Sequence, residues 1–438
     1  MKNIKQHIQK IFKEDPDNLY QISIWIDEHL APKDVEKEKN AEVSTPYSLR
    51  QDMLDLLPKS FWKNPNYKVF EPCAGKGGFV IDIIHRFMIG LKDKIKDSKK
   101  RYEHILKNQV YFADINKKNI EIIKILIDPF DKYSINSYKG DTLKIDLHKT
   151  WNIDCFETVI GNPPYSIGQE VSEKKGGGDL LWNKFVIEAL DKWLLKDGYL
   201  IYVHPSGWRK PPSEKSKYVD LFNLMTHENQ MVYLEIHNTE DGMKVFHCGT
   251  RYDFYVIQKK KPTKKTEIKD EKGKKIKIDL TKFTFLPNYD IQTVKKILAT
   301  KKEKTVDILF STSKYETRKK WVSDKKSNKF KYPLIHSTTK KGIRYLYSNT
   351  NKNGFFGIPK VIFGDSGINK SSIIDMNGKY GMTQHAMAIQ DSKSNLPKIK
   401  KALDSYQFGE ILDACSWSNF QIDWRLFTYL KKDFWKYL

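Results

Sequence analysis

The stretch that decides the fold reads VFEPCAGKGGF and covers residues 69–79. Its opening residues resemble the end of a buried strand, and small residues then lead directly into an apolar run that starts at Phe79. Strand, glycine-rich turn and helix in this order begin a βαβ unit, and small residues in such a turn let the backbone approach a cofactor closely. The stretch is not a GxGxxG motif, and it is not a Walker loop because no Gly-Lys-Ser or Gly-Lys-Thr follows.

The alternation of strands and helices continues on both sides of this stretch. Ser-Thr-Pro at residues 44–46 is a helix-start signal, and further helices are expected at 79–91, 117–127 and 180–195. Apolar, β-prone runs predict strands at 67–71, 110–114, 158–161, 199–204, 231–237 and 252–258. This rhythm predicts an α/β fold, a Rossmann-like domain with a mostly parallel sheet.

Two further regions flank this α/β domain. Residues 1–40 place apolar side chains at helical spacing, which predicts an N-terminal helical cap. Residues 259–280 are strongly charged and form either a linker or an exposed hairpin that turns at 271–274. We take this segment as the domain boundary. The expected organisation is therefore a cap at 1–40, an α/β domain at 41–262, and a second domain of α+β character at 281–438.

Composition limits the classes of protein to which this chain can belong. A length of 438 residues suggests two or three domains at ~150 residues each. The 77 Lys and Arg against 54 Asp and Glu give a formal charge of +23, which fits either a polyanionic partner or the lysine bias of an AT-rich genome. The four cysteines are scattered without a CxxC pair, which argues against a disulfide framework and against a cysteine-based zinc site.

Nothing in the sequence suggests a membrane or an exported protein. No apolar run approaches the ~18 residues of a membrane span, and the first ten residues lack the apolar core of a secretory signal. We therefore expect an intracellular, reducing compartment.

The most informative segment is VIGNPPY, residues 159–165. Two prolines cannot continue a strand ladder, so the chain leaves the sheet rigidly at the carboxyl end of a strand, where open α/β sheets bind ligands. The amide of Asn162 and the carbonyl of Pro163 are two acceptors for a planar amino group, which becomes a better nucleophile when held in this way. Tyr165 is placed to stack on a base. The alternative for these residues alone is a tight turn in which Asn162 caps and Tyr165 packs.

Two acids follow other expected strands. Asp114 ends the strand at 110–114, where a ribose-binding carboxylate lies in Rossmann-like sheets, although it follows Glu71 by far more than the ~20 residues of a plain dinucleotide fingerprint. The lysine-rich residues 92–101 look like the insertion responsible. Asp141 follows Gly140 at another expected strand end. Each acid alone is more often a cap or a turn residue, but the ordered set predicts one cofactor site.

Residues 40–260 together resemble the adenine-N6 DNA methyltransferases of the gamma arrangement, which use S-adenosylmethionine. In that arrangement the cofactor motifs precede Asn-Pro-Pro-Tyr and a target-recognition domain is C-terminal. The resemblance implies that residues 41–262 are the methyltransferase domain and that residues 281–438 recognise the DNA target. It further implies double-stranded DNA as partner, no metal, no membrane, a monomer or homodimer, and the cytoplasm of a prokaryotic or virus-infected cell, within a restriction-modification system.

The resemblance also implies roles for individual residues. Asn162, Pro163 and Tyr165 are the catalytic residues, and Tyr165 with Phe246 stacks on the flipped-out base. An ordinary core position is an equal alternative for Phe246. Cysteine and alanine are exchanged at positions 73 and 74 relative to the Glu-Pro-Ala-Cys type of the family's cofactor motif. The residues implied in cofactor binding are Thr45, Tyr47, Glu71, Pro72, Ala74, Gly75, Asp114, Ile115, Asp141 and Asn162.

Other functions remain open at this point. An RNA adenine-N6 methyltransferase would carry the same catalytic loop, and a non-catalytic DNA-binding subunit would keep the fold. A protein-glutamine methyltransferase also uses Asn-Pro-Pro-Tyr but without a large C-terminal domain. A fused endonuclease is disfavoured, because we find no convincing PD…(D/E)xK pattern and residues 1–40 are too few for a nuclease domain. A cytosine-C5 enzyme would need a nucleophilic Pro-Cys, whereas Cys73 belongs to the cofactor turn.

Overall fold

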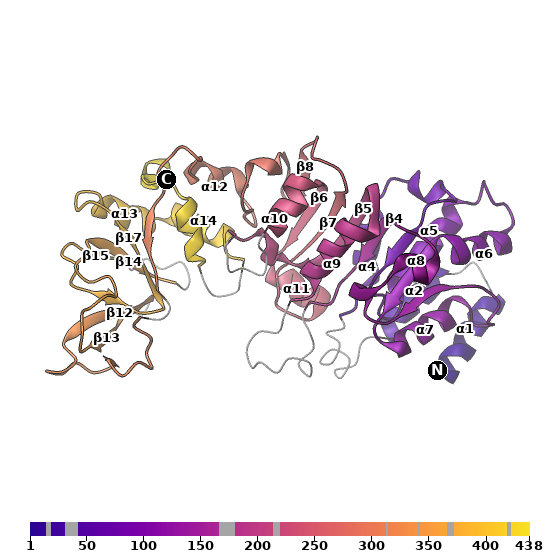
Figure 1. Ribbon diagram of the computed structural model, residues 1–438, viewed down its shortest axis with the longest axis horizontal. Helices are drawn as coiled ribbons and strands as arrows, with labels where there is room; N and C mark the ends of the chain where they lie inside the picture. The colour runs from indigo at the N-terminus through magenta and orange to yellow at the C-terminus, as the bar shows by residue number, and fades with distance from the viewer. Residues whose placement is uncertain are drawn as a thin grey trace. The chain divides into compact units, whose positions relative to one another are not determined.

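The computed structural model describes residues 1–14, 19–30, 43–165, 180–212, 220–311, 314–339, 342–365, 372–417 and 422–438 (Figure 1). The chain forms two compact units. The first unit comprises Met1–Trp208 and Lys215–Thr284, and the second comprises Arg209–Glu214 and Phe285–Leu438. Residues 15–18 and 31–40 of the expected N-terminal cap lie outside the described residues.

The first unit is built on a nine-stranded sheet with the order β3-β2-β1-β4-β5-β7-β6-β8-β9. Neighbouring strands from β3 to β5 are parallel, and β7 is inserted antiparallel between β5 and β6. The expected α/β fold with a mostly parallel, Rossmann-like sheet is therefore confirmed. The strands are β1 (Val69–Glu71), β2 (Val110–Asp114), β3 (Asn136–Lys139), β4 (Phe156–Gly161), β5 (Leu194–Pro205), β6 (Gln230–His237), β7 (Tyr252–Gln258), β8 (Thr266–Lys269) and β9 (Lys275–Ile278).

Helices pack against both faces of this sheet. Strand residues alternate between the faces, so Val69 enters the core under α5 while its neighbour Phe70 stacks on Phe156 and meets Trp151 and Trp193. The helices of the unit are α1 (Lys2–Glu14), α2 (Leu19–His29), α4 (Tyr47–Leu54), α5 (Gly78–Gly90), α6 (Ser98–Asn108), α7 (Lys117–Ile127), α8 (Leu147–Trp151), α9 (Trp182–Glu188), α10 (Leu221–Asn223) and α11 (Thr239–Phe246). None of the described helices is long and apolar enough to span a membrane.

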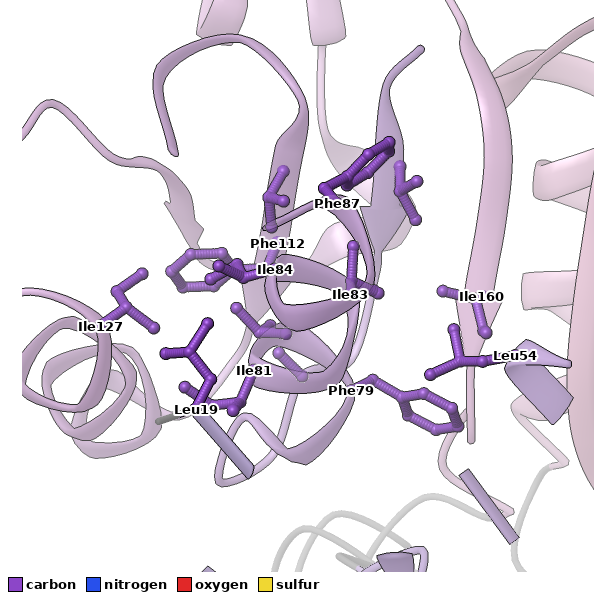
Figure 2. Packing of buried hydrophobic residues seen from close by; sticks show 14 of the residues in the cluster. Leu19, Leu54, Phe79, Ile81, Ile83, Ile84, Phe87, Phe112, Ile127 and Ile160 are labelled. Carbon is purple, nitrogen blue, oxygen red and sulfur yellow. The ribbon is translucent and has the colours of Figure 1, made fainter. Parts of the chain in front are cut away.

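Helix α5 is the centre of the main core. It is apolar around most of its circumference, as expected of a helix covered on several sides. Figure 2 shows its side chains between those of Leu19, Phe112 and Ile127 on one side and those of Leu54 and Ile160 on the other. The N-terminal helices belong to the same core, because the apolar faces of α1 and α2 are buried in it.

Two helices differ from the sequence-based expectation. Helix α6 was expected only as part of a lysine-rich insertion, but Asp97 caps it and Tyr102, Ile105 and Leu106 bury one face. The helix expected at 180–195 is shorter, because its last turn is a π-helix and β5 already begins at Leu194. The first difference arises because lysines interrupt the apolar face of α6. The second arises because one apolar run contributes to both a helix and the strand that follows it.

Residues 263–284 also belong to the first unit. The charged segment is a hairpin of β8 and β9 that turns through Gly273, whose φ is +80°. Strand β8 pairs with β6, and the apolar side chains of Ile268 and Ile278 are buried while the alternating lysines point outward. The segment expected to mark the boundary is thus an extension of the sheet, and the unit ends at Thr284.

The second unit has α+β character. It holds two four-stranded sheets with the orders β10-β17-β14-β15 and β11-β13-β12-β16. Their strands are β10 (Asp307–Leu309), β11 (Val322–Ser323), β12 (Tyr332–Thr339), β13 (Gly342–Ser348), β14 (Lys360–Gly364), β15 (Ile373–Asp375), β16 (Gly381–Met382) and β17 (Ala386–Gln390). Helices α12 (Ile291–Ile297), α13 (Leu396–Leu403) and α14 (Tyr406–Ala414) share a core with the 3-10 turns Trp424–Tyr429 and Phe434–Tyr437.

Candidate active site

The candidate site lies where the sheet order reverses. The chain runs from β1 outward to β2 and β3 and then returns to the other side of β1 with β4. Ligands of open α/β sheets bind at the carboxyl ends of strands beside such a reversal. Glu71 ends β1, Asp114 ends β2, and Asn162 directly follows β4, so the three side chains meet at one edge of the sheet.

The glycine-rich turn is held by backbone contacts to neighbouring strands. Ala74 N–H donates to the Ala113 carbonyl at 2.9 Å, and Thr142 Oγ1 donates to the Pro72 carbonyl at 2.8 Å. Gly77 has φ +87°, and a Cβ there would lie 2.7 Å from Ile123 Cγ1. A Cβ on Gly78 would meet the Arg50 guanidinium at 2.7 Å, so both positions require glycine.

Asp114 locks this turn to the end of β2. Its carboxylate accepts the Gly75 N–H at 2.8 Å through one oxygen and the Asn116 N–H at 2.7 Å through the other. The neighbouring Ile115 is 67% exposed, which leaves an apolar surface beside the carboxylate. Asp141 caps the turn after β3 by accepting the Leu143 N–H, and it forms an ion pair with Lys144.

One pocket joins the cofactor turn to the catalytic loop. Of the residues expected from the sequence, Thr45, Glu71, Ala74, Gly75 and Asn162 line it. The other expected cofactor residues are outside its lining: Pro72 is next to it in the chain, Tyr47 and Asp114 are hydrogen-bonded to the lining residues Asp27 and Gly75, and Ile115 and Asp141 are neither. The complete lining is Ile26, Asp27, Leu30, Val43, Ser44, Thr45, Arg50, Glu71, Cys73, Ala74, Gly75, Lys76, Gly78, Phe79 and Asn162.

Two buried oxygens in this pocket have no hydrogen-bond partner among the described residues. They are Oε2 of Glu71, whose residue is 3% exposed, and Oδ1 of Asn162. Burial raises the pKa of Glu71 well above its ordinary value, although the Arg50 charge opposes this effect. An orphaned buried acceptor is costly, so both oxygens are suited to donors carried by a ligand.

The amide of Asn162 is oriented from the other side. Its Nδ2 donates to the Val43 carbonyl at 3.3 Å, which leaves Oδ1 as the unpartnered acceptor of this pocket-lining residue. Burial of the Tyr165 hydroxyl raises the pKa of Tyr165, so this phenol stays protonated at neutral pH.

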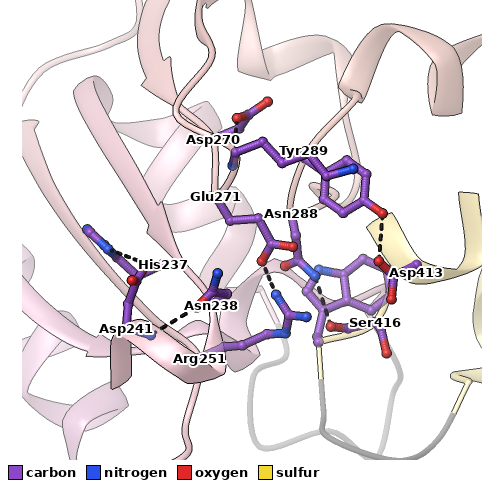
Figure 3. Close-up of polar contacts among 12 residues, drawn as sticks. His237, Asn238, Asp241, Arg251, Asp270, Glu271, Asn288, Tyr289, Asp413 and Ser416 are labelled. Carbon is purple, nitrogen blue, oxygen red and sulfur yellow. Dashed lines mark hydrogen bonds and ion pairs between the residues drawn. The ribbon is translucent and has the colours of Figure 1, made fainter. Parts of the chain in front are cut away.

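Tyr165 and Phe246 lie together, as the sequence suggested. Their ring centroids are 6.5 Å apart and the rings meet edge to face at 81°. Phe246 is the last residue of α11 and contacts Tyr252, which stacks on His237 at 4.4 Å with an interplanar angle of 3°. Figure 3 shows the further contact from His237 Nδ1 to Asp241, which lies in the first turn of α11.

Sequence reasoning missed the cluster around Arg50. Its guanidinium is buried and donates to Asp82 at 2.6 Å, to Asp27 at 2.7 Å and to Ser23 at 2.8 Å. These partners come from α5 and α2, far from Arg50 in the sequence. The only signal in the sequence is a lone arginine beside the apolar positions Leu49 and Met53.

Residues 46–246 match the family of Eco57I restriction-modification methylases. This part of the chain is similar to a restriction-modification methylase domain. The expected resemblance to adenine-N6 DNA methyltransferases, which use S-adenosylmethionine, is thereby confirmed, whereas the gamma arrangement stays a prediction. The match begins at Pro46, next to the helix start expected from Ser-Thr-Pro, and its last residue is Phe246.

Individual relatives are more distant. An uncharacterized adenine-specific methylase of Mycoplasma pneumoniae is 21% identical over 238 residues, which are 39% of this chain and 56% of that protein. The chain therefore spans little more than half the length of this curated relative. The structure of a DrdV–DNA complex is similar with a TM-score of 0.51 at 11% identity, over 99% of this chain and 58% of that one, and shows a shared fold. The M protein of the type I restriction enzyme EcoKI gives a TM-score of 0.38 at 15% identity, over 50% and 47% of the two chains.

The pocket residues fit the methylase cofactor. S-adenosylmethionine carries an ammonium group and ribose hydroxyls, which are donors for the buried carboxylate of Glu71 and for the carboxylate of Asp114. The absence of a side chain at Gly78 leaves room for the Arg50 guanidinium at the start of α5. Among the residues that the structure describes, no three His, Cys, Asp or Glu side chains are placed to hold a metal ion.

Proposed function

We propose that this protein transfers a methyl group from S-adenosylmethionine to the N6 amino group of adenine in double-stranded DNA. The observation that carries the proposal is that Asn162, whose buried Oδ1 has no hydrogen-bond partner among the described residues, lines the same pocket as the cofactor turn. Donor and acceptor of the methyl group would then meet at the end of β4. The match of residues 46–246 to a restriction-modification methylase family supports DNA as the substrate.

Asn162 and Pro163 would hold the amino group. The Asn162 side-chain oxygen and the Pro163 carbonyl accept its two hydrogens, which turns the nitrogen lone pair toward the pocket. Fixed acceptors in a buried site act without reorganisation when charge develops on the nitrogen. When bound, S-adenosylmethionine supplies an already activated methyl group, so these residues contribute mainly orientation and electrostatic stabilisation.

The target adenine has to leave the duplex to reach this loop. The amino group of a paired adenine lies inside the stack, so enzymes acting on it extrude the base. Tyr165 and Phe246 would take up the flipped base between their rings. Their present edge-to-face contact at 6.5 Å requires a rearrangement of one ring before a base can enter.

The second unit is proposed to recognise the DNA sequence. Lysines lie over aromatic rings of this unit, for example Lys319 over the exposed Trp321 and Lys379 over the partly buried Tyr380. Lysines can contact phosphates and position the protein, whereas base edges have to be read by other groups. Methylation without cleavage is the expected reaction of the chain.

A methyl-transfer assay with radiolabelled cofactor tests this proposal. Duplex DNA, single-stranded DNA and RNA are offered separately, and the product nucleosides are analysed. We expect N6-methyladenosine in its deoxy form from duplex DNA, because the proposed flipping acts on a duplex. Label in RNA would favour the alternative of an RNA adenine-N6 methyltransferase, and no label in any of the three would favour a non-catalytic subunit.

Asn162→Ala is the variant that probes the chemistry. It should lower methyl transfer at least 100-fold while binding of S-adenosylhomocysteine persists, since one fixed electrostatic contact to the reacting group is worth about 10²–10³ in kcat. Asn108→Ala, which alters an asparagine at the end of α6 outside the pocket, is the matched control. Retained activity in Asn162→Ala would refute the catalytic assignment.

A further inference from the structure

We propose that helix α2 completes the cofactor pocket and that Asp27 on this helix binds the α-amino group of the methionine part of S-adenosylmethionine. This inference rests on the proposed function. It concerns residues that precede the family match at 46–246, so the match assigns them no role.

Helix α2 forms one wall of the pocket. Ile26, Asp27 and Leu30 at its C-terminal end line the pocket together with the cofactor turn. The helix is anchored behind this wall, because Ile22 and Ile26 are buried in the main core and Ser23 Oγ donates to Asp82 at 2.6 Å. The wall is therefore a fixed part of the first unit.

Asp27 is held in place but remains accessible. Oδ2 accepts the Tyr47 N–H at 2.6 Å, and Oδ1 accepts Arg50 Nη1 at 2.7 Å. The side chain of Asp27 is 26% exposed, and the residue lines the pocket. A carboxylate offers about four lone-pair positions, so two remain for a ligand.

Around Arg50, carboxyl groups outnumber the cations that pair with them. Arg50 pairs with both Asp82 and Asp27, and its single charge neutralises only one of the two. Glu71 adds a buried carboxyl group with an unpartnered oxygen. Lys76 also lines the pocket, but its ammonium lies 2.8 Å from Asn119 Oδ1. An ammonium group with three donors would satisfy Asp27 and Glu71 together.

The test compares two ligands on two proteins by titration calorimetry. The ligands are S-adenosylhomocysteine and its analogue without the α-amino group, which keeps the adenosine, the thioether and the carboxylate. We expect Asp27→Asn to weaken S-adenosylhomocysteine roughly 10-fold or more and to leave the analogue unchanged within twofold, as expected for loss of one charged hydrogen bond. The unaltered protein should bind the analogue without the amino group more weakly than S-adenosylhomocysteine, by a similar factor.

Asp55→Asn is the matched control. Asp55 also pairs with an arginine, Arg86, but it lies outside the pocket and is 64% exposed at its side chain. This variant should bind both ligands as the unaltered protein does.

Three results would overturn the inference. The first is normal binding of S-adenosylhomocysteine by Asp27→Asn. The second is an equal loss of affinity for both ligands in Asp27→Asn, which would mean that Asp27 only shapes the wall. The third is equal affinity of the unaltered protein for the two ligands, which would show that the amino group is not recognised. This measurement tests the inference even if the variant does not fold. Binding of neither ligand by the unaltered protein would refute the proposed function as well, so the two failures are distinguishable.

Discussion

Single side chains in this site are fixed by backbone groups from other strands. Both carboxylate oxygens of Asp114 accept backbone N–H groups, those of Gly75 and Asn116. The amide nitrogen of Asn162 donates to the Val43 carbonyl. Such bonds pre-set the direction of the remaining lone pairs, which is where a ligand would be recognised. The role of Asp114 is therefore both structural and, as we propose, ligand-binding.

Asp114→Asn should weaken binding of S-adenosylhomocysteine about 10-fold or more, because an asparagine presents an NH₂ group to one of the two N–H donors and removes a charge from the ribose end. Titration calorimetry measures the affinity directly. Asp154→Asn, which alters an acid with an 88% exposed side chain after α8, serves as the control. Unchanged affinity in Asp114→Asn would contradict the ribose assignment.

At the scale of elements, Arg50 joins three helices. It lies on α4 and bonds to α2 through Asp27 and Ser23 and to α5 through Asp82. A buried guanidinium with satisfied partners contributes little net stability, but removal of one partner leaves the other charge uncompensated. The consequence of losing Arg50 is thus set by Asp82, which is buried.

Arg50→Met should destabilise the first unit by about 3–5 kcal/mol, the range for breaking a buried pair from one side. Urea unfolding followed by tryptophan fluorescence measures the loss. The double variant Arg50→Met with Asp82→Asn should recover part of it, because the stranded charge is then removed as well. If the double variant is as unstable as the sum of the single changes, the pair makes no coupled contribution.

Strand β6 carries a second acid with several hydrogen-bond partners, Glu235, where the β8–β9 hairpin joins the sheet. Glu235 accepts from Lys269 of β8 at 2.7 Å and from the Tyr233 hydroxyl at 2.5 Å. Burial alone would raise the pKa of Glu235, but hydrogen bonds from His237, Lys269 and Tyr233 outweigh burial and lower the pKa to about 2. Figure 3 shows a further ion pair at the hairpin, between Arg251 and Glu271.

This pKa predicts acid sensitivity. A carboxyl group whose pKa is lowered on folding stabilises the native state above its unfolded pKa, and this stabilisation is lost as the pH falls from about 4.5 toward about 2. Glu235→Gln should therefore lose less thermal stability between pH 5 and pH 3 than the unaltered protein does. Glu267→Gln, at a more exposed pair with Lys277, should behave like the unaltered protein. Parallel pH dependence in Glu235→Gln and the unaltered protein would refute this contribution.

The sequence predicted the elements whose pattern is local. The strand, turn and helix of residues 69–90 were predicted because apolar periodicity and glycine placement are contiguous there. The β8–β9 hairpin was left open as linker or hairpin, because its lysines hide the alternation of Ile268 and Ile278. The Arg50 cluster was invisible, since its partners Asp27 and Asp82 become neighbours only after folding. Local sequence patterns predict individual helices and strands. The approach of distant polar groups to one another depends on the packing of α2 against α5, which no local pattern predicts.

At the scale of the whole molecule, the formal charge of +23 has a measurable consequence. Each duplex phosphate contacted should lower log K by ~0.9 per unit of log salt concentration. Removal of residues 285–438 should abolish selectivity between DNA sequences, because we propose that the second unit recognises the DNA sequence. Fluorescence anisotropy with several duplexes across salt concentrations measures both effects, and retained binding of S-adenosylhomocysteine verifies that the remaining unit is folded. Preserved selectivity after the deletion would contradict the recognition role.

The second unit is not continuous in the chain. Arg209–Glu214 belongs to it although the rest begins at Phe285, and the buried Arg209 guanidinium donates to the carbonyls of Leu286 and Pro287 and to Asn288. Exchange of this unit between relatives, whether by recombination or by engineering, therefore needs matched joints in two places. A graft made only at residue 285 would leave Arg209 facing a foreign loop.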